Sequence, residues 1–517
     1  MIKAYKDYFI ILLLGIFSFY INFHYAHVGV MPMDNFVLYN GGYRVLKGFV
    51  PFNDYWLVTG PLLDYLNAFF FNIFGTNWKV YIFHSSSFNV IITLATYLLF
   101  IDLKLPRLWS LFYSALFSCL MYSVVGTPFV DHHSTIFLII AFYLFVHGIH
   151  SISIKFHFCI PSLFMLSFLS KQTPAAYGAI GMFFLILIYI FLNIKEVKKI
   201  VGTFFFGTLF AILFLLLFFY FTKIKLTNFM DQYIFFAQTI GESRLSNANY
   251  NFLDLFLEYK FINIFLIYLI GALILLPNKT TLNKNIFLTI LSAIFLSLIM
   301  IFHQTITFNQ NFIFFLIPFL MAIIHIYKGH LVKNKNYIFI LLLTICIFSV
   351  GKYHLRFNEQ RKFNELEKVD LTKAIEAENI DKSLRGLKWI TAIYPLDPSK
   401  EILDIKEAMN IVKNEKKNKT IITQYQFIAP VLSLYDYSPN QWHHPTVSFP
   451  MRDQKFFNKY KIFFVNQLKK NNIEIIYTIG DGQHIVELVL DSSCFEKKQE
   501  GSIIFSHYIN NKCKDFK

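Results

Sequence analysis

Over the first 351 residues, long apolar runs alternate with short polar connections. A helix needs ~20 apolar residues to cross the hydrocarbon layer of a bilayer, and most of these runs approach that length. The first run begins at Tyr8, after Lys3 and Lys6, and because no small-residue cleavage site follows it we expect an uncleaved first helix. The pattern predicts about eleven membrane-spanning helices, at residues 8–25, 79–101, 108–125, 134–150, 157–170, 175–193, 200–222, 260–277, 286–302, 312–327 and 336–351.

The connection between the first two predicted spans, residues 27–78, has a helical pattern of its own. Apolar spacing predicts a helix over residues 35–46, ended by Gly48, and a second, amphipathic helix over residues 62–74, opened by Pro61. Helices of this composition lie along membrane surfaces. We therefore expect two surface helices beside the mouth of the bundle.

Hydropathy falls sharply after Gly351, which predicts a change of domain. Residues 352–386 are charged, with a helical pattern, and are interpreted as a connector. Residues 387–517 alternate strand and helix patterns, which is typical of a small α/β domain. The expected strands are residues 387–394, 420–424 and 473–479, and the expected helices are residues 399–415, 427–434 and 454–470. The predicted fold class is an all-α polytopic membrane bundle, residues 1–351, with an α/β domain at its C-terminal end.

Composition supports a membrane protein and argues against a nucleic-acid partner. Hydrophobic residues make up 56% of the 517 positions and charged residues 15%, against roughly 25% charged in soluble domains. The net charge of +15 is divided between the two parts: residues 1–351 carry 21 Lys and Arg against 11 Asp and Glu, and residues 352–517 carry 26 against 21. No basic stripe with interleaved aromatic residues is present, so no nucleic-acid binding is expected.

The basic residues predict the orientation of the bundle. If the N-terminus is cytoplasmic, the cytoplasmic connections hold 13 Lys and Arg and the much longer external connections hold 8. This imbalance follows the positive-inside tendency. We therefore expect a multi-pass protein of the plasma membrane, such as a bacterial inner membrane, with the C-terminal domain on the extracytoplasmic side. An oxidising exterior would permit a disulfide between Cys494 and Cys513, which the sequence leaves open.

The acidic residues sort the opposite way from the basic ones. Eight of the eleven within residues 1–351 fall in predicted external connections, and none lies in the middle of a span. Ion-coupled pumps usually place ionisable groups near the bilayer centre. The polar chemistry of this chain is instead expected at the external mouth of the bundle.

Features of the first external loop resemble one enzyme family. Asp34 follows the first span, a Gly48-x-x-Pro51-aromatic-x-Asp54 turn comes next, and Gly60-Pro61 precedes the amphipathic helix. This arrangement resembles the first external loop of the GT-C glycosyltransferases, which include protein mannosyltransferases and the aminoarabinose transferase of lipid A. Lys171-Gln172-Thr173, after the fifth span, is similar to a tripeptide of many bacterial members, and the predicted architecture is similar as well.

The resemblance implies an inverting transfer of a sugar from a polyprenyl-phosphate donor to an envelope glycan, lipid or protein. Such a reaction needs a base for the acceptor hydroxyl and positive charge for the departing phosphate. Asp34 matches the position of the family's first-loop Asp, which makes it the candidate base, and Asp131 matches the second acidic position in placement. Both also suit the N-cap of a helix, so a capping role stays open for each.

Further polar residues of the external loops are candidates for substrate binding. Lys171 is a cation next to the helix-breaking Pro174, where a lipid phosphate could bind. An ordinary loop lysine is the alternative for Lys171, and Asp54 equally suits a turn. The full set of substrate-binding candidates is Asp54, Arg44, Lys171, Gln172, Arg244 and His303.

A divalent metal ion is a candidate cofactor, because Asp131 is followed by His132 and His133. Carboxylate and imidazole groups bind such ions, although neighbouring residues do not easily converge on one ion. At most one of the two histidines is therefore expected as a ligand. In the C-terminal domain, Trp442 lies in a polar-aromatic loop and is interpreted as a loop anchor, with stacking on a sugar as the alternative.

The sequence thus predicts a glycosyltransferase whose partners are a polyprenyl-phosphate sugar donor, an envelope acceptor and membrane lipids. Two other classes stay open. A transporter or lipid flippase would be expected to show charges within its spans and a repeat between its halves, and neither is evident. A non-catalytic protein of polysaccharide assembly or export would use the external domain to bind a partner.

Overall fold

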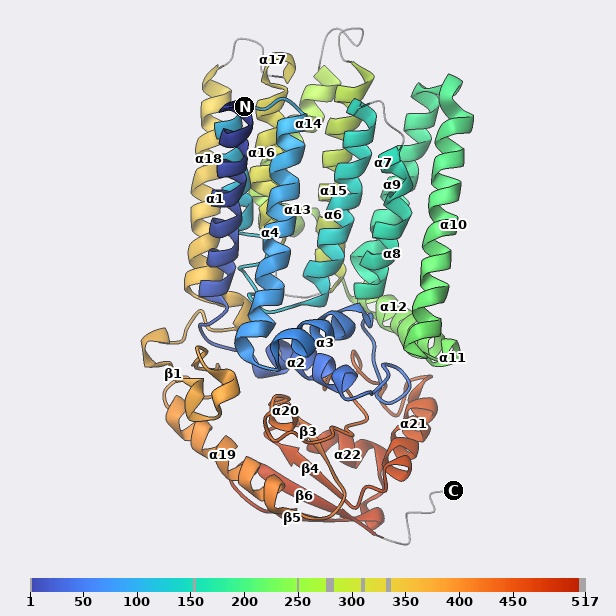
Figure 1. Ribbon diagram of the computed structural model, residues 1–517, viewed down its shortest axis with the longest axis vertical. Helices are drawn as coiled ribbons and strands as arrows, with labels where there is room; N and C mark the ends of the chain where they lie inside the picture. Colours follow the sequence, from blue (N-terminus) through green and yellow to red (C-terminus); the bar gives the residue numbers. More distant parts are fainter. Residues whose placement is uncertain are drawn as a thin grey trace.

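The computed structural model of the chain describes residues 2–151, 155–248, 251–275, 283–307, 312–331 and 336–510. A bundle of roughly parallel helices stands on a smaller C-terminal domain, and the N-terminus and α17 (Lys328–Leu331) lie at the far end of the bundle (Figure 1). Seven helices of this described part are long and apolar enough to cross a membrane: α1 (Ile2–Tyr25), α4 (Trp78–Asp102), α6 (Val130–Ser151), α9 (Gln172–Leu192), α10 (Val197–Thr222), α15 (Lys284–Thr307) and α18 (Asn336–His354).

The prediction of eleven spans is therefore wrong in number. An eighth span is counted if α13 (Phe252–Glu258) and α14 (Lys260–Leu275), which meet at a bend of 104°, form one broken span. The other three predicted spans contain shorter helices: α5 (Arg107–Ser118), then α7 (Lys155–Phe158) with α8 (Ile160–Ser170), and α16 (Leu316–Ile326). A helix of 12 residues, the length of α5, is about 18 Å long, whereas the hydrocarbon layer is ~30 Å thick.

The outer surface of the bundle is suited to lipid. On α10, Phe206 is 63% exposed, Leu213 54% and Phe221 74%. Exposure of so large an apolar surface to water would be unfavourable, whereas contact with the acyl chains of a bilayer would not. The long helices and this surface together are compatible with a polytopic membrane protein.

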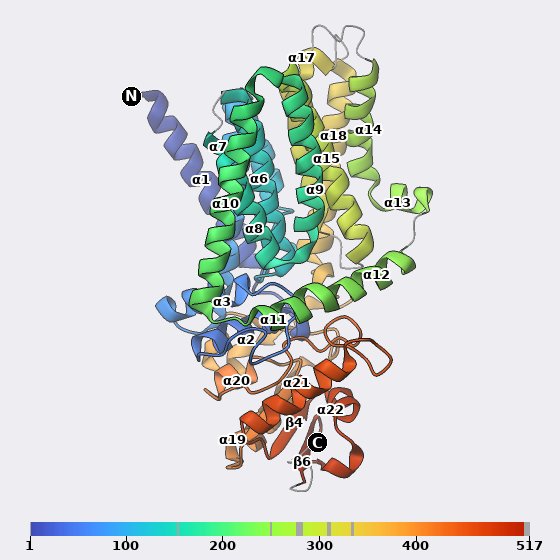
Figure 2. The same cartoon turned by 90° about the vertical axis from the view of Figure 1, so that its right-hand side faces the viewer.

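Two short helices lie across the end of the bundle, where the sequence predicts them (Figure 1). They are α2 (Pro32–Leu46) and α3 (Leu62–Phe74), and α3 ends at Gly75, whose φ of 86° lies in the left-handed region. A second segment crosses the same end: α11 (Leu226–Phe229), a π-helix (Met230–Phe236) and α12 (Ala237–Asn247) (Figure 2). These elements form a layer between the long helices and the C-terminal domain.

The aromatic side chain of Phe36, on α2, packs on both the bundle and the domain. Its ring centroid lies 5.2 Å from that of Trp78, at the start of α4, and 4.7 Å from that of Phe427, in the domain. Trp389 stacks on Phe36 as well, at 6.0 Å. The domain is therefore joined to the bundle by a continuous apolar core.

The C-terminal domain contains a mixed sheet in the order β3-β4-β6-β5, in which β3 and β4 are parallel and the other pairs are antiparallel. Two of the three predicted strands, residues 420–424 and 473–479, are present as β3 and β4, and two of the three predicted helices, residues 399–415 and 454–470, are present as α19 and α21. The third predicted helix, residues 427–434, contains only the four-residue α20. The third predicted strand, residues 387–394, contains only β2, which pairs with β1 outside this sheet. The β5–β6 hairpin was not predicted. The elements are β1 (Ile375–Glu376), β2 (Lys388–Trp389), α19 (Pro398–Asn414), β3 (Lys419–Thr423), α20 (Ile428–Val431), α21 (Phe457–Lys470), β4 (Ile475–Ile479), α22 (Gln483–Val489), β5 (Phe495–Gln499) and β6 (Ile504–Ile509).

The predicted connector, residues 352–386, is not a continuous helix. After α18 it continues as a π-helical turn, Leu355–Glu359, and then as single 3-10 turns. Its Arg361 is 1% exposed and donates to the backbone carbonyls of Val28, Ser123 and Val125. The connector therefore closes the end of the bundle. The predicted Cys494–Cys513 pair lies outside the described residues, because Cys513 does.

Candidate functional site

A cavity of about 550 Å³ lies between the end of the bundle and the C-terminal domain. Its size is within the range of small-molecule sites. Segments that are far apart in the sequence form its walls: Asp34 of α2, residues 58–59, the start of α6, residues 171–173, the segment 233–245, the end of α15, and residues 442–448 of the domain.

Asp131, the second residue of α6, is the centre of a buried ionic network. The ammonium nitrogen of Lys171 lies 2.7 Å from each carboxylate oxygen, and Nε2 of His303 lies 3.2 Å from Oδ1. The side chains of Asp131 and His303 are at most 1% exposed, and that of Lys171 is 13% exposed. Three predicted site residues from α6, the α8–α9 break and α15 are therefore brought together.

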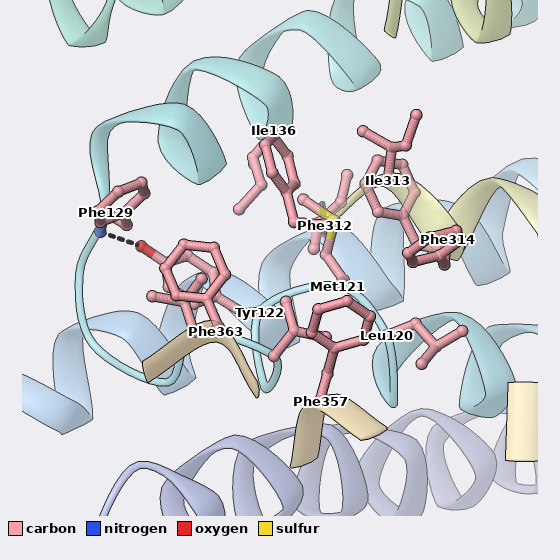
Figure 3. Close-up of a cluster of buried hydrophobic side chains, with 14 of the residues drawn as sticks. Leu120, Met121, Tyr122, Phe129, Ile136, Phe312, Ile313, Phe314, Phe357 and Phe363 are labelled. Carbon is pink, nitrogen blue, oxygen red and sulfur yellow. Dashed lines mark hydrogen bonds between the residues drawn. The ribbon is translucent and has the colours of Figure 1, made fainter. Parts of the chain in front are cut away.

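The first turn of α6 is held by a dense core. Figure 3 shows the hydrogen bond from the backbone N–H of Phe129 to the hydroxyl of Tyr122, 2.9 Å long, in a cluster of buried side chains that also contains Phe312 and Phe363. Because Phe129 immediately precedes α6, this packing fixes where the helix begins. The position of Asp131 is thereby fixed as well.

Asp34 lies in the third position of α2 and lines the cavity. The predicted alternative, a helix N-cap, is wrong, since Met31 occupies the N-cap position and its N–H donates to Oδ1 of Asn35, 2.7 Å away. Among the described residues, no side chain or backbone group forms a hydrogen bond or ion pair with the Asp34 carboxylate.

The surroundings of Asp34 make it a weaker acid than usual. Burial, with smaller contributions from the negative charges of Glu365 and Asp131, raises the pKa of Asp34 to about 7, while the charge of Lys171 opposes the shift. A carboxyl group that changes protonation near neutral pH is suited to accept a proton from a substrate. The structure thus places an unpartnered carboxyl beside the Asp131–Lys171 pair.

Gln172 and Arg244 also line the cavity. The side-chain amide of Gln172 donates to the carbonyl oxygens of Val58 and Tyr233, both at 2.8 Å, so it joins the first loop to the π-helix. Arg244 comes from α12, and no ion pair to its guanidinium is found in the described part of the chain. Gln172 therefore shapes the wall, and Arg244 supplies a cation that is suited to bind an anion.

Arg44 does not reach the cavity, contrary to the prediction. Its side chain is 1% exposed, Nε donates to Oδ2 of Asp436 at 2.8 Å, and Nη1 donates to the carbonyl oxygen of Asn440 at 3.2 Å. The guanidinium also lies over the ring of Tyr55. Arg44 therefore fastens α2 to the domain, and it is not available to a phosphate.

Asp54 likewise lies outside the cavity, and its contacts are structural. Its Oδ2 accepts the backbone N–H of Val50 at 2.7 Å, as expected of a turn residue, and its Oδ1 pairs with Lys470 of α21 at 2.6 Å. The alternative that the sequence left open, a contact to substrate or metal, has no support in this position.

The two histidines that are candidate metal ligands, His132 and His133, have different surroundings. The ring nitrogens of His133 face Tyr122 (2.7 Å) and His84 (3.0 Å), and His132 packs against Phe312 with a centroid distance of 4.4 Å. Asp131 is engaged by Lys171. Within the described residues, no three His, Cys, Asp or Glu side chains are placed to hold a metal ion.

Sequence reasoning missed Thr59 and His444, and it interpreted Trp442 as a loop anchor, yet all three line the cavity. Thr59 is positioned by its neighbour: the N–H of Gly60 donates to the carbonyl of Ser170 at 3.0 Å, and a Cβ at Gly60 would lie 1.9 Å from the carbonyl oxygen of Leu169. The available signal was the Gly60-Pro61 pair, because a glycine permits such a close backbone approach.

An apolar groove adjoins the cavity on the side of the bundle. It has a volume of about 360 Å³, lies between α9 and α15, and is lined only by apolar and aromatic residues and one glycine. Tyr177 lines both the groove and the cavity. The cavity that contains Asp34, Asp131, Lys171 and Arg244 therefore continues into an apolar groove on two of the candidate spanning helices.

No protein-family model matches this chain, and comparison with curated proteins gives no match either.

Proposed function

We propose that this protein is a membrane glycosyltransferase that moves a sugar from a polyprenyl-phosphate donor to a glycan, lipid or protein acceptor. The observation that carries the proposal is Asp34: an unpartnered carboxyl with a pKa of about 7, in a cavity that also holds Lys171 and Arg244. The resemblance of the first loop to the GT-C glycosyltransferases points the same way.

The shape of the site supports a lipid-linked donor. A polyprenyl-phosphate sugar has an apolar tail, an anionic phosphate and a hydroxyl-rich head. The groove between α9 and α15 suits the tail, and the cavity that it joins at Tyr177 suits the head. Arg244 is the main phosphate contact and Lys171 a weaker one, because the charge of Lys171 is already largely balanced by Asp131.

Each side chain then has a defined part in an inverting transfer. Asp34 accepts the proton of the acceptor hydroxyl, and the oxygen attacks the anomeric carbon on the face opposite the phosphate. The bond between the anomeric carbon and the phosphate oxygen breaks, and polyprenyl phosphate leaves with the bonding electrons. Arg244 and Lys171 stabilise the negative charge that develops on the leaving group.

We place the cavity and the C-terminal domain on the extracytoplasmic side of a bacterial inner membrane. The N-terminus and α17 lie at the opposite end of the bundle from the domain (Figure 1). The positive-inside tendency assigns that opposite end to the cytoplasm.

The groove alone would also serve a lipid flippase. A flippase, however, has no need of an unpartnered carboxyl at one end of the bundle, whereas a transferase needs a base at that point. A transferase is therefore the hypothesis that accounts for both the groove and Asp34.

The test is a transfer assay with the purified full chain. Undecaprenyl-phosphate-linked glucose, galactose, mannose, N-acetylglucosamine and aminoarabinose are each incubated with the protein and a detergent extract of bacterial cell envelope as the acceptor source. We expect one donor to release undecaprenyl phosphate, detected by mass spectrometry, and the Asp34→Asn variant to release none. Equal release by Asp34→Asn and wild type would remove Asp34 as the base.

A further inference from the structure

The cavity has two chemically different sides. The bundle side holds Lys171 and the apolar groove, and the opposite side is built by residues 442–448 of the C-terminal domain together with Thr59 of the first loop. A lipid-linked donor enters from the bundle side. The side formed by Thr59 and the domain, here called the Thr59–Trp442 wall, is therefore free to bind a second molecule.

Two residues that form this wall each have a buried polar atom without a partner. Trp442 is 8% exposed and Thr59 is 9% exposed, and neither Nε1 of Trp442 nor Oγ1 of Thr59 has a hydrogen-bond partner among the described residues. A buried donor or acceptor without a partner lowers the stability of a fold. Such groups on the wall of a cavity are suited to bind a ligand that supplies the missing partners.

The wall is held rigidly from outside the cavity. Trp56 and Asn440 form a parallel β-bridge, in which the N–H of Trp56 donates to the carbonyl of Pro439 at 2.7 Å. Thr59 lies three residues beyond Trp56, and Trp442 lies two residues beyond Asn440. Both residues therefore follow the two strands of this bridge closely in the sequence. The next residue after Asn440, Gln441, donates to both carboxylate oxygens of Asp64 on α3, at 3.0 and 3.2 Å.

The candidate base shares the cavity with this wall. Asp34, Thr59, Trp442 and His444 all line it. A base must face the hydroxyl from which it takes a proton. A molecule bound on the Thr59–Trp442 wall is therefore in the same cavity as Asp34 and can present a hydroxyl group to it.

We propose that the Thr59–Trp442 wall is an acceptor subsite that binds a sugar ring, with the indole N–H of Trp442 and the hydroxyl of Thr59 bonding to sugar hydroxyls. An indole offers an apolar face and a single donor, and a pyranose offers an apolar face rimmed with hydroxyl groups. This inference rests on the proposed function and narrows it, because it makes the acceptor a glycan. The C-terminal domain then selects the acceptor.

The test uses the full chain in a detergent without a sugar headgroup. Methyl glycosides of hexoses, N-acetylhexosamines, 6-deoxyhexoses and pentoses are screened by saturation-transfer NMR, and undecaprenyl phosphate is titrated in parallel. We expect at least one glycoside to bind the wild type. Trp442→Phe and Thr59→Val should each raise its Kd by at least about threefold, as the loss of one hydrogen bond implies, and leave the Kd for undecaprenyl phosphate unchanged.

Trp78→Phe is the matched control. Trp78 is 0% exposed and its Nε1 also lacks a partner among the described residues, but it does not line the cavity. This variant should leave glycoside binding unchanged. An equal loss in Trp78→Phe and Trp442→Phe would overturn the subsite, and so would an equal loss of glycoside and undecaprenyl phosphate binding in Trp442→Phe.

The two proposals can fail separately in this experiment. If no glycoside binds the wild type while undecaprenyl phosphate does, the acceptor subsite is wrong and the lipid-linked donor stands. If a glycoside binds through Trp442 while undecaprenyl phosphate does not bind, the sugar subsite stands and the proposed transferase fails.

Discussion

The ammonium group of Lys171 lies 2.7 Å from both carboxylate oxygens of Asp131, although 40 residues separate them in the sequence. With the Asp131 side chain 1% exposed and that of Lys171 13% exposed, the two charges depend on each other. Removing one member of such a pair leaves the other charge buried without compensation. The pair therefore holds the α8–α9 break against the first turn of α6.

Either Lys171→Met or Asp131→Asn should destabilise the protein by about 3–5 kcal/mol, because each leaves one buried charge unpaired. The double variant should recover much of this loss, since no uncompensated charge remains. Thermal unfolding in detergent measures all three. A Lys171→Met variant as stable as wild type would show that the pair does not support the fold.

Asp34→Asn should abolish sugar transfer without destabilising the protein, because the carboxylate has no partner to lose among the described residues. Asp64→Asn is the matched control. Burial also raises the pKa of Asp64 to about 7, but its carboxylate accepts from Tyr55 and Gln441 outside the cavity. The control should lose stability and retain transfer, so the reverse result would contradict the assignment.

The pH dependence follows from the raised pKa of Asp34. The charged form acts as the base, so transfer should increase as the pH rises through about 7. The fold disfavours this charged form. The stabilisation that comes from a protonated Asp34 should therefore be complete below the usual carboxyl range and be lost as the pH rises to about 7. Asp34→Asn should remove this part of the pH profile of stability, which thermal unfolding between pH 5 and pH 8 would measure.

A chain of buried hydrogen bonds connects the helices that carry the two candidate catalytic carboxylates. It begins at the N–H of Phe129, before α6, and ends at the carbonyl of Leu38, in α2. The links are Phe129 N–H to Tyr122 Oη (2.9 Å), Tyr122 Oη with His133 Nδ1 (2.7 Å), His133 Nε2 with His84 Nε2 (3.0 Å), His84 Nδ1 with Asn67 Oδ1 (2.6 Å) and Asn67 Nδ2 to Leu38 O (3.0 Å).

Tyr122→Phe breaks this chain at its α6 end. It leaves the N–H of Phe129 and a ring nitrogen of His133 without their short partner, which should cost about 1–3 kcal/mol and lower the transfer rate. Tyr113→Phe is the control, since the hydroxyl of Tyr113 also bonds to a histidine, His325, at 3.1 Å, away from the cavity. The control should lose stability alone. Equal rates for the two variants would remove the positioning role of the chain.

Gly41→Ala should loosen the C-terminal domain from the bundle. A Cβ at this position of α2 would lie 2.1 Å from Oδ1 of Asp64 and 2.4 Å from Nε2 of Gln441. Hydrogen exchange should become faster in the segment around Gln441. Gly351→Ala meets no atom within 4 Å and should be neutral or slightly stabilising, as alanine is favoured over glycine in a helix. Unchanged exchange in Gly41→Ala would show that α2 can shift at no cost.

A reporter that is active only outside the cytoplasm, fused after Thr76, should be active. In the proposed orientation the first loop lies outside the cytoplasm, where an externally presented lipid-linked donor can reach Asp34. A reporter fused within residues 193–197 should be inactive. Activity in the reverse pattern would overturn the proposed site, since the cavity would then face the cytoplasm.

Local features of the fold were well predicted where a local pattern defines them. The helices α2, α3, α19 and α21 occur where apolar spacing and breakers such as Gly75 place them. The count of spans was wrong because hydropathy measures apolar content and not helix length: after α5 ends at Ser118, the mostly apolar residues 119–125 continue as largely buried turns. The β5–β6 hairpin was missed because β5 is a charged, exposed edge strand with no apolar alternation.

The site residues also differ in whether a local sequence pattern predicted them. That Asp34, Asp131 and Lys171 would lie near one end of the bundle follows from their places at the ends of apolar runs. That Arg44 would be buried against Asp436, 392 residues away, has no local signal at all. Nor does the sequence show that Thr59 and Trp442 would share a wall.

The sequence by itself determined a chain of apolar helices with its polar chemistry at one end, because membrane solvation acts on each segment through its own composition. Only the tertiary structure decided which charges pair, which carboxyl is left without a partner, and which side chains surround the cavity. These depend on contacts between distant segments, such as that of His303 with Asp131 across 172 residues. Tertiary packing determines such contacts, and no local sequence pattern predicts them.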